Sequence, residues 1–286
     1  MKSATRILRN RIILIFDFDA TLGPGSTGVL FKELGMDYDS FQKQVNKYHH
    51  EEMWQYALAK AEMLRVYSYQ EGSPLNKKAM EQVGKEYPLF EGVETLTERL
   101  REFTAELDQD IKLEFVLLTA GFGTIPKASK VGETFDRVYC GELLFDEDGK
   151  VLGAKRVITH VDKVHYIRQL QEGIELTDPS DLENTYLQTD PDDHYVPMSQ
   201  IIYVGDGASD MSAFQAVEEG GGIAIAVDPE GSGDNWEGYD QMEVQRRVHN
   251  IAKAEFGEED ELYKSLKLAI HRMVKDIELL RFGKDE

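Results

Sequence analysis

The chain has 286 residues, of which 41% are hydrophobic, enough to bury a sizeable core in one large domain or in one domain that carries an insertion. Its 53 acidic residues outnumber the 32 basic ones, and the net charge of -21 opposes binding to nucleic acid or to anionic lipid surfaces. The single cysteine, Cys140, excludes an internal disulfide and a cysteine zinc cluster, and it favours a reducing compartment.

The amino-terminal segment places basic residues before a short apolar run, the order found in secretory signal peptides. The run "IILIF" at 12–16 ends at Asp17, whereas a signal peptide needs about seven to fifteen apolar residues. We therefore expect a buried strand. No stretch approaches the roughly 20 apolar residues of a membrane span, so the sequence predicts a cytoplasmic protein without a membrane partner.

Short apolar runs predict the strands of a parallel sheet that helices cover on both faces. They are "IILIFDFDAT" at 12–21, "KLEFVLLTAG" at 112–121, "QIIYVGDGASD" at 200–210 and "GGIAIAV" at 221–227. The first three become polar at their carboxyl ends, which is the edge where open α/β sheets bind ligands. The sequence therefore predicts an α/β fold whose polar strand ends meet in one crevice.

The segment between the first two runs, 25–88, is rich in helix-forming residues. Apolar and aromatic residues recur in it at helical spacing, as at Val45, Trp54 and Leu58. We expect a small helical cap domain over the crevice. The rest of the chain, 1–24 and 89–286, is then the α/β core.

Other parts of the core have weaker signals. A helix is predicted over 89–103, a hairpin over 140–158 around an acidic turn, and a helix in the tail, 241–282. The acidic segment 175–199 lacks periodicity and is predicted to be a surface insertion. Trp236 is expected to anchor a loop rather than to cover the crevice.

Two carboxylates stand one residue apart at the end of the first run. Alternation along an extended chain sends Asp17 and Asp19 to the same side and Phe18 to the other. With Asp206 at the end of a later run, they supply the oxygen ligands that Mg²⁺ prefers. Any one of these acids alone would be explained by helix capping or by solvent exposure.

The order of several features makes a shared site the better interpretation. The acid pair is followed by Thr119 at the end of the next run, by Lys163 at the start of an amphipathic helix and by "GDGASD" at 205–210. This order resembles the haloacid dehalogenase superfamily of phosphohydrolases. "DFDAT" resembles its first motif, "LLTAG" its second, "VDKVHYI" its third and "IIYVGDGASD" its fourth. The helical insertion and the hairpin resemble the phosphoserine phosphatase-like branch.

The resemblance implies a Rossmann-like parallel sheet and a role for each matching residue. Asp17 would be the nucleophile and a metal ligand. Asp19 would be the general acid and base, with its backbone carbonyl on the metal, and Asp206 would ligate Mg²⁺ directly. The phosphoryl oxygens would be held by the following residues: Phe18, Thr119, Ala120 and Gly121.

The third-motif lysine would neutralise the phosphorylated aspartate. Lys163 fits best because it lies in the first turn of a predicted helix, but Lys150 and Lys155 also precede the last motif and stay alternatives. Asp210 would act through a water or by orienting Lys163.

These residues imply a Mg²⁺-dependent phosphatase that hydrolyses a small phosphomonoester through an aspartyl phosphate. The alternatives are a phosphomutase or phosphotransferase with the same nucleophile, or a binding protein without activity. Asp19 opposes a dehalogenase or phosphonatase, because those members replace the second acid. The chain departs from serine-specific members, since no Glu follows "DFDATL" closely and the second motif is "TAG". Its oligomeric state cannot be deduced from the sequence.

Three other signals carry less weight. "GPGSTG" at 23–28 matches a dinucleotide fingerprint, but the acids before it would repel a pyrophosphate, so a hinge is expected. His49 and Glu52 lie at helical spacing, but two residues do not make a metal site. Arg65, the one arginine in the predicted cap, would contact a substrate anion or lie in solvent.

Overall fold

The computed structural model describes residues 8–174, 194–228 and 247–282. Its sheet has seven strands in the order β4-β3-β2-β1-β5-β6-β7. The strands are β1 (Arg11–Phe16), β2 (Lys112–Phe122), β3 (Arg137–Phe145), β4 (Val151–Arg156), β5 (Ile201–Gly205), β6 (Ile223–Asp228) and β7 (Asn250–Lys253). All neighbouring pairs are parallel except β3 and β4, so the predicted α/β fold with a mainly parallel sheet is confirmed.

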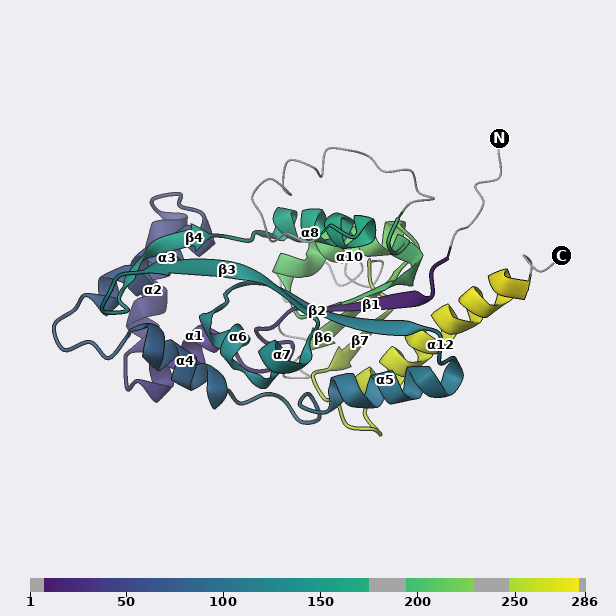
Figure 1. Ribbon diagram of the computed structural model, residues 1–286. Helices are drawn as coiled ribbons and strands as arrows, with labels where there is room; N and C mark the ends of the chain where they lie inside the picture. The colour runs from purple at the N-terminus through teal and green to yellow at the C-terminus, as the bar shows by residue number, and fades with distance from the viewer. Residues whose placement is uncertain (1–7, 175–193, 229–246, 283–286) are drawn as a thin grey trace.

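Strand β1 lies in the middle of the sheet and is buried on both faces. Leu14 belongs to the core on one face, and Ile13 and Ile15 belong to the core on the other. Helices α5 (Leu96–Leu107) and α12 (Glu261–Phe282) cover the first face, and α8 (His160–Glu172) and α10 (Met211–Glu219) cover the second (Figure 1). A continuous apolar run is stable here because each fully buried side chain contributes about 1.5–3 kcal/mol.

Four helices lie between β1 and α5, within the segment 25–88. They are α1 (Ser26–Glu33), α2 (Tyr38–His50), α3 (Tyr56–Ser68) and α4 (Lys77–Lys85), and they gather at the end of the molecule where β3 meets β4 (Figure 1). An aromatic cluster joins the first three, with the ring of Phe31 4.4 Å from that of Phe41 and 5.6 Å from that of Tyr67. The regular secondary structure within residues 25–88 is all α-helical, as the sequence predicts.

The predicted hairpin is present, but its first strand also belongs to the main sheet. Residues 137–141 of β3 pair with β2, and residues 142–145 pair with β4. The hairpin contacts α3 and the turn after it, because Tyr69 donates a hydrogen bond to Asp146 Oδ2 (2.5 Å) and Val151 donates one to Ser68 Oγ (3.2 Å).

One predicted helix begins later than expected, and one strand was missed. The helix expected over 89–103 begins at Leu96, because residues 91–95 form turns. Gly92, among them, has a φ of 84°, which is not a helical conformation. Strand β7 was not predicted because its four residues give too short a pattern. The tail helix is confirmed as α12.

Short helices complete the described chain: α6 (Thr124–Ala128), α7 (Lys130–Thr134), and the 3-10 turns η2 (Met198–Gln200) and η3 (Ala208–Asp210). Most of the predicted insertion, 175–193, and the loop with Trp236 lie outside the described residues. Among the helices that are described, none combines the length and the apolarity that a bilayer span requires.

Candidate active site

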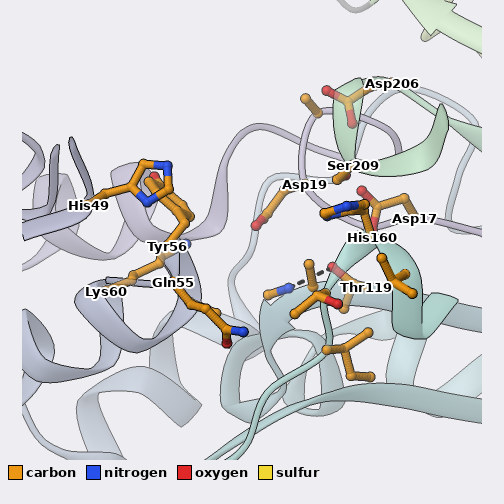
Figure 2. A pocket seen from close by; sticks show the side chains of 17 residues that line it. Asp17, Asp19, His49, Gln55, Tyr56, Lys60, Thr119, His160, Asp206 and Ser209 are labelled. Atoms are coloured by element: carbon orange, nitrogen blue, oxygen red, sulfur yellow. Dashed lines mark hydrogen bonds between the residues drawn. The ribbon is translucent and has the colours of Figure 1, made fainter. Parts of the chain in front are cut away.

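The carboxyl ends of β1, β2 and β5 meet at one edge of the sheet, because β1 pairs with both of the other strands. A cavity of about 660 Å³ opens there, and Figure 2 shows the side chains around it. Its lining includes three carboxylates and one hydroxyl that the sequence analysis assigned to the site: Asp17, Asp19, Asp206 and Thr119. The second-motif residues Ala120 and Gly121 also line it, so the predicted crevice exists.

Asp17 is fixed at the end of β1 and is only 4% exposed. Its amide donates a hydrogen bond to the carbonyl of Val204 on β5 (2.9 Å). The carboxylate atom Oδ1 is buried and receives no well-aligned hydrogen bond from the described residues, although Lys163 Nζ lies 3.2 Å from it. Burial raises the pKa of Asp17 to about 7 against the lowering effect of Lys163, and Asp210 and Asp19 add to the rise.

Lys163 is placed by the first turn of α8. The helix begins with a capping box, in which the Thr159 side chain accepts a hydrogen bond from the Asp162 amide and Asp162 accepts one from Thr159. Lys163 is fully buried, with its ammonium 2.6 Å from Asp210 Oδ1. Burial alone would lower its pKa, but Asp17 and Asp210 raise it, so this lysine stays charged.

The two alternative lysines lie elsewhere, at the hairpin. Lys155 forms an ion pair with Glu142 (3.3 Å), and Lys150 lies 5.2 Å from the centre of the Tyr69 ring. Of the three candidates, only Lys163 is in contact with the carboxylates of the site.

Asp210 is engaged by several donors at once. Its Oδ1 accepts hydrogen bonds from Lys163 and from Tyr203 Oη (2.5 Å), and its Oδ2 accepts one from the Gly207 amide (3.3 Å). Both Tyr203 and Asp210 are fully buried. Asp210 is therefore arranged to hold Lys163 in position.

Asp19 points toward the amino terminus of α1. Its Oδ1 accepts a hydrogen bond from the Ser26 amide (2.7 Å), where the helix dipole favours a negative charge. Ala20, which follows it, has a φ of 57°, a backbone conformation that costs a non-glycine residue about 1–2 kcal/mol. This turn carries the chain from the first motif directly into the helical segment.

Thr119 ends the apolar part of β2 and is 1% exposed. Its Oγ1 accepts a hydrogen bond from the Gly121 amide (3.1 Å). A Cβ at Gly121 would lie 3.2 Å from Asp19 Oδ2 and 3.3 Å from Thr119 Oγ1, so the glycine keeps this corner of the cavity open. Phe18 has its side chain buried with its ring centre 4.8 Å from that of Tyr87, which leaves only its backbone for a phosphoryl group.

Carboxylate oxygens suitable for a metal ion gather at the end of β5. Oxygens of Asp17, Asp206 and Asp210 lie within 4.8 Å of one another. Burial, together with the neighbouring Asp17 and Asp210, raises the pKa of Asp206 to about 8 against the lowering effect of Lys163. The residues fit a hard divalent cation, because the donor set is all carboxylate and Asp17 Oδ1 is buried without a well-aligned donor.

Several lining residues were not predicted as part of the site. They come from α2, α3 and their connection, and from α8 and η3: His49, Gln55, Tyr56, Lys60, His160 and Ser209. The "HHEEMW" pattern drew attention to His49, but a single sequence gives no signal for which helix face meets the sheet. Arg65 is not among the lining residues and pairs with Glu62 (2.6 Å).

No family model matches the chain. An uncharacterized protein of Borreliella burgdorferi is 24% identical over 230 residues, which cover 72% of this chain and 78% of that one.

Solved structures are similar over most of the chain. A HAD family hydrolase from Salmonella enterica serovar Typhi has a TM-score of 0.54 at 15% identity, covering 85% of this chain and 67% of that one. A substrate-bound phosphoserine phosphatase has a TM-score of 0.55 at 17% identity, covering 91% of this chain and 99% of that one. A phospho-aspartyl intermediate analogue of phosphoserine phosphatase has a TM-score of 0.54, also at 17% identity, covering the same shares. The chain has the fold of haloacid dehalogenase-like hydrolases of the phosphoserine phosphatase type.

Proposed function

We propose that this protein is a Mg²⁺-dependent phosphatase that hydrolyses a small phosphomonoester through a phosphorylated Asp17. The observation that carries the proposal is the buried contact between Lys163 and Asp17, a residue that lines the cavity. A buried carboxylate beside a fixed cation has the charge balance that an aspartyl phosphate needs. The shared fold of the phosphatases described above supports the same reaction class.

In the reaction we propose, a carboxylate oxygen of Asp17 attacks phosphorus and the bond to the leaving oxygen breaks. Asp19 gives its proton to that oxygen, because a leaving alkoxide is costly without a proton donor. Water then attacks phosphorus, Asp19 takes the proton, and phosphate leaves with Asp17 restored. Asp19 can serve both steps because it lines the cavity beside Asp17.

The remaining residues hold the transferring group. Thr119 and the amides of Ala120 and Gly121 would donate to phosphoryl oxygens, and Lys163 would offset the charge on phosphorylated Asp17. Mg²⁺ would be held by Asp17 and Asp206 with the backbone carbonyl of Asp19, and it would neutralise a phosphoryl oxygen. Asp210 is assigned to orient Lys163, since its own oxygens are already engaged.

Residues 25–88 are proposed to act as a cap domain on a core made of 1–24 and 89–286. The cap would exclude water and select the leaving group, because α2 and α3 supply one wall of the cavity. Because the net charge of -21 opposes binding to nucleic acid or to an anionic membrane, we propose a small molecule as the substrate. The buried thiol of Cys140 fits a reducing compartment such as the cytoplasm.

Phosphate release from a panel of small phosphomonoesters tests the proposal, with Mg²⁺ and with chelator. Release that needs Mg²⁺ and disappears in Asp17→Asn is the expected result. Wild-type release by Asp17→Asn would overturn the nucleophile assignment. A phosphorylated wild-type protein that water does not hydrolyse would favour a phosphotransferase, and no reaction at all would favour a binding protein.

A further inference from the structure

The cavity has two walls with different charge. One wall carries the carboxylates Asp17, Asp19 and Asp206. The other comes from α2, α3 and their connection, and its polar side chains face the first wall across the cavity in Figure 2: His49, Gln55, Tyr56 and Lys60. A substrate whose phosphoryl group lies beside Asp17 would extend its leaving group toward this second wall.

Lys60 is the side chain of that wall with a permanent charge. It is partly buried, and within residues 8–174, 194–228 and 247–282 its ammonium has no hydrogen bond, ion pair or ring contact. The nearby arginine, Arg65, is already paired with Glu62. Because partial burial of an unpaired charge is unfavourable, an anion bound beside Lys60 would offset this cost.

His49 adds a second group with a defined orientation. Its Nδ1 donates a hydrogen bond to the carbonyl of Trp54 (2.7 Å), because a carbonyl can only accept. The ring also packs edge-on against Tyr56, with ring centres 5.6 Å apart. These two contacts hold the imidazole at the wall of the cavity, on the same side as Lys60.

Within the part of the chain that the structure describes, no carboxylate lines the second wall. Among the described residues that line the cavity, the acids are Asp17, Asp19 and Asp206, all on the catalytic side. An ammonium on the leaving group would be repelled by Lys60, and no carboxylate among the described residues of this wall would attract it. An oxyanion on the leaving group would meet a cation that has no ion-pair partner among the described residues.

We infer that the substrate is a phosphomonoester whose leaving group carries a second oxyanion, a carboxylate or another phosphoryl group, and no ammonium. Lys60 is then the main specificity-determining residue, and His49 assists it. This inference rests on the proposed function, since it assumes that the phosphoryl group lies beside Asp17. It also distinguishes this chain from the phosphoserine phosphatases that share its fold, because phosphoserine carries an ammonium.

Three substrates with one carbon skeleton test the inference. They are 3-phosphoglycerate with a carboxylate, O-phosphoserine with a carboxylate and an ammonium, and glycerol 3-phosphate with neither. One well-placed charged hydrogen bond should raise kcat/KM for 3-phosphoglycerate about 10–100-fold over glycerol 3-phosphate. O-Phosphoserine should fall below 3-phosphoglycerate. Propane-1,3-diol bisphosphate, compared with its monophosphate, shows whether a phosphoryl group serves better than a carboxylate.

Charge variants show whether the substrate preference depends on Lys60 itself or on the total charge of the protein. Lys60→Gln should reduce the preference for 3-phosphoglycerate over glycerol 3-phosphate to within about threefold, mainly through KM, and Lys60→Glu should reverse the order of 3-phosphoglycerate and O-phosphoserine. Lys43→Gln removes the same charge from an exposed position on α2 outside the cavity, and it should keep the wild-type preference.

A binding measurement keeps the inference separate from the proposed function. Calorimetric titration of Asp17→Asn with 3-phosphoglycerate and with glycerol 3-phosphate needs no turnover, and the first should bind about 10–100-fold more tightly. Equal binding of both, or tighter binding of O-phosphoserine than of 3-phosphoglycerate, would overturn the inference even if phosphatase activity is present. Preferential binding of 3-phosphoglycerate by Asp17→Asn, together with no phosphate release by the wild-type protein, would support the inference and contradict the proposed function.

Discussion

The ammonium of Lys163 lies 3.2 Å from Asp17 Oδ1, and the two side chains are 0% and 6% exposed. Water screens this pair very little, so each charge depends on the other. Asp210 holds the same ammonium at 2.6 Å, which leaves Lys163 between two carboxylates. The lysine is therefore a structural cation, and in the reaction proposed above it is also the group that would meet a phosphorylated Asp17.

Lys163→Met should lower kcat at least about 100-fold, because the ammonium beside Asp17 would no longer offset the charge that develops there. It should also reduce the free energy of unfolding by about 3–5 kcal/mol, since buried carboxylates would lose their partner. Lys155→Met is the matched control, because Lys155 pairs with Glu142 at the surface and is 63% exposed. Steady-state kinetics and urea unfolding measure both effects. If Lys155→Met loses activity and Lys163→Met does not, the lysine assignment is wrong.

Asp19→Asn should slow turnover most for substrates with poor leaving groups. An alkyl phosphate needs a proton on its leaving oxygen, whereas p-nitrophenolate leaves without one. We expect the burst-phase rate, which reports phosphorylation of Asp17 alone, to fall about 100-fold or more with glycerol 3-phosphate and much less with p-nitrophenyl phosphate. The Ser26 amide can still donate to an asparagine oxygen, so the fold should be kept. Equal losses for both substrates would contradict the role of Asp19 as a general acid.

The fold was predictable from the sequence because a strand buried on both faces needs a continuous apolar run. The runs ending at Asp17, Thr119 and Asp206 each became a strand in the parallel sheet, and their carboxyl ends meet as expected. The site residues at those strand ends could be predicted because the carboxyl ends of neighbouring parallel strands lie at the same edge of the sheet.

The second wall of the cavity was not predictable for a physical reason. Lys60 and His49 lie on helices whose orientation depends on packing among Phe31, Phe41 and Tyr67 and against β4. Helical spacing shows which residues share a face, but not which face meets the sheet. Tyr203 was likewise hidden, because a tyrosine within an apolar run has the pattern of any core aromatic side chain.

The metal-free protein should lose stability as the pH rises from about 4 to 8. Burial raises the pKa of Asp17 to about 7 and that of Asp206 to about 8, above the ordinary value of 3.8. In this range the folded state holds protons that the unfolded state has released, so the free energy of unfolding falls as pH rises.

Mg²⁺ should reverse this trend, because it favours the ionised carboxylates and displaces their protons. The rise in Tm on adding Mg²⁺ should be larger at pH 8 than at pH 6, and the affinity for Mg²⁺ should increase about tenfold or more between them. Differential scanning calorimetry and titration calorimetry measure the two quantities. Asp206→Asn is the control and should flatten both dependences. An affinity independent of pH in the wild type would show that these carboxylates do not bind the ion.

Tyr203→Phe tests whether the fourth-motif carboxylate needs its buried hydroxyl donor. The Tyr203 hydroxyl lies 2.5 Å from Asp210 Oδ1, the same oxygen that Lys163 contacts. Removing the hydroxyl leaves Asp210 with Lys163 and the Gly207 amide, so the loss of stability should be about 1–2 kcal/mol. Because Asp210 would then hold Lys163 less firmly, kcat should fall severalfold, far less than in Lys163→Met, while KM stays within about twofold. If Tyr203 only stabilised the fold, its loss would lower Tm and leave kcat unchanged at temperatures below the unfolding transition. A Tyr203→Phe variant that is folded in the assay and keeps the wild-type kcat would therefore show that Tyr203 does not position Lys163.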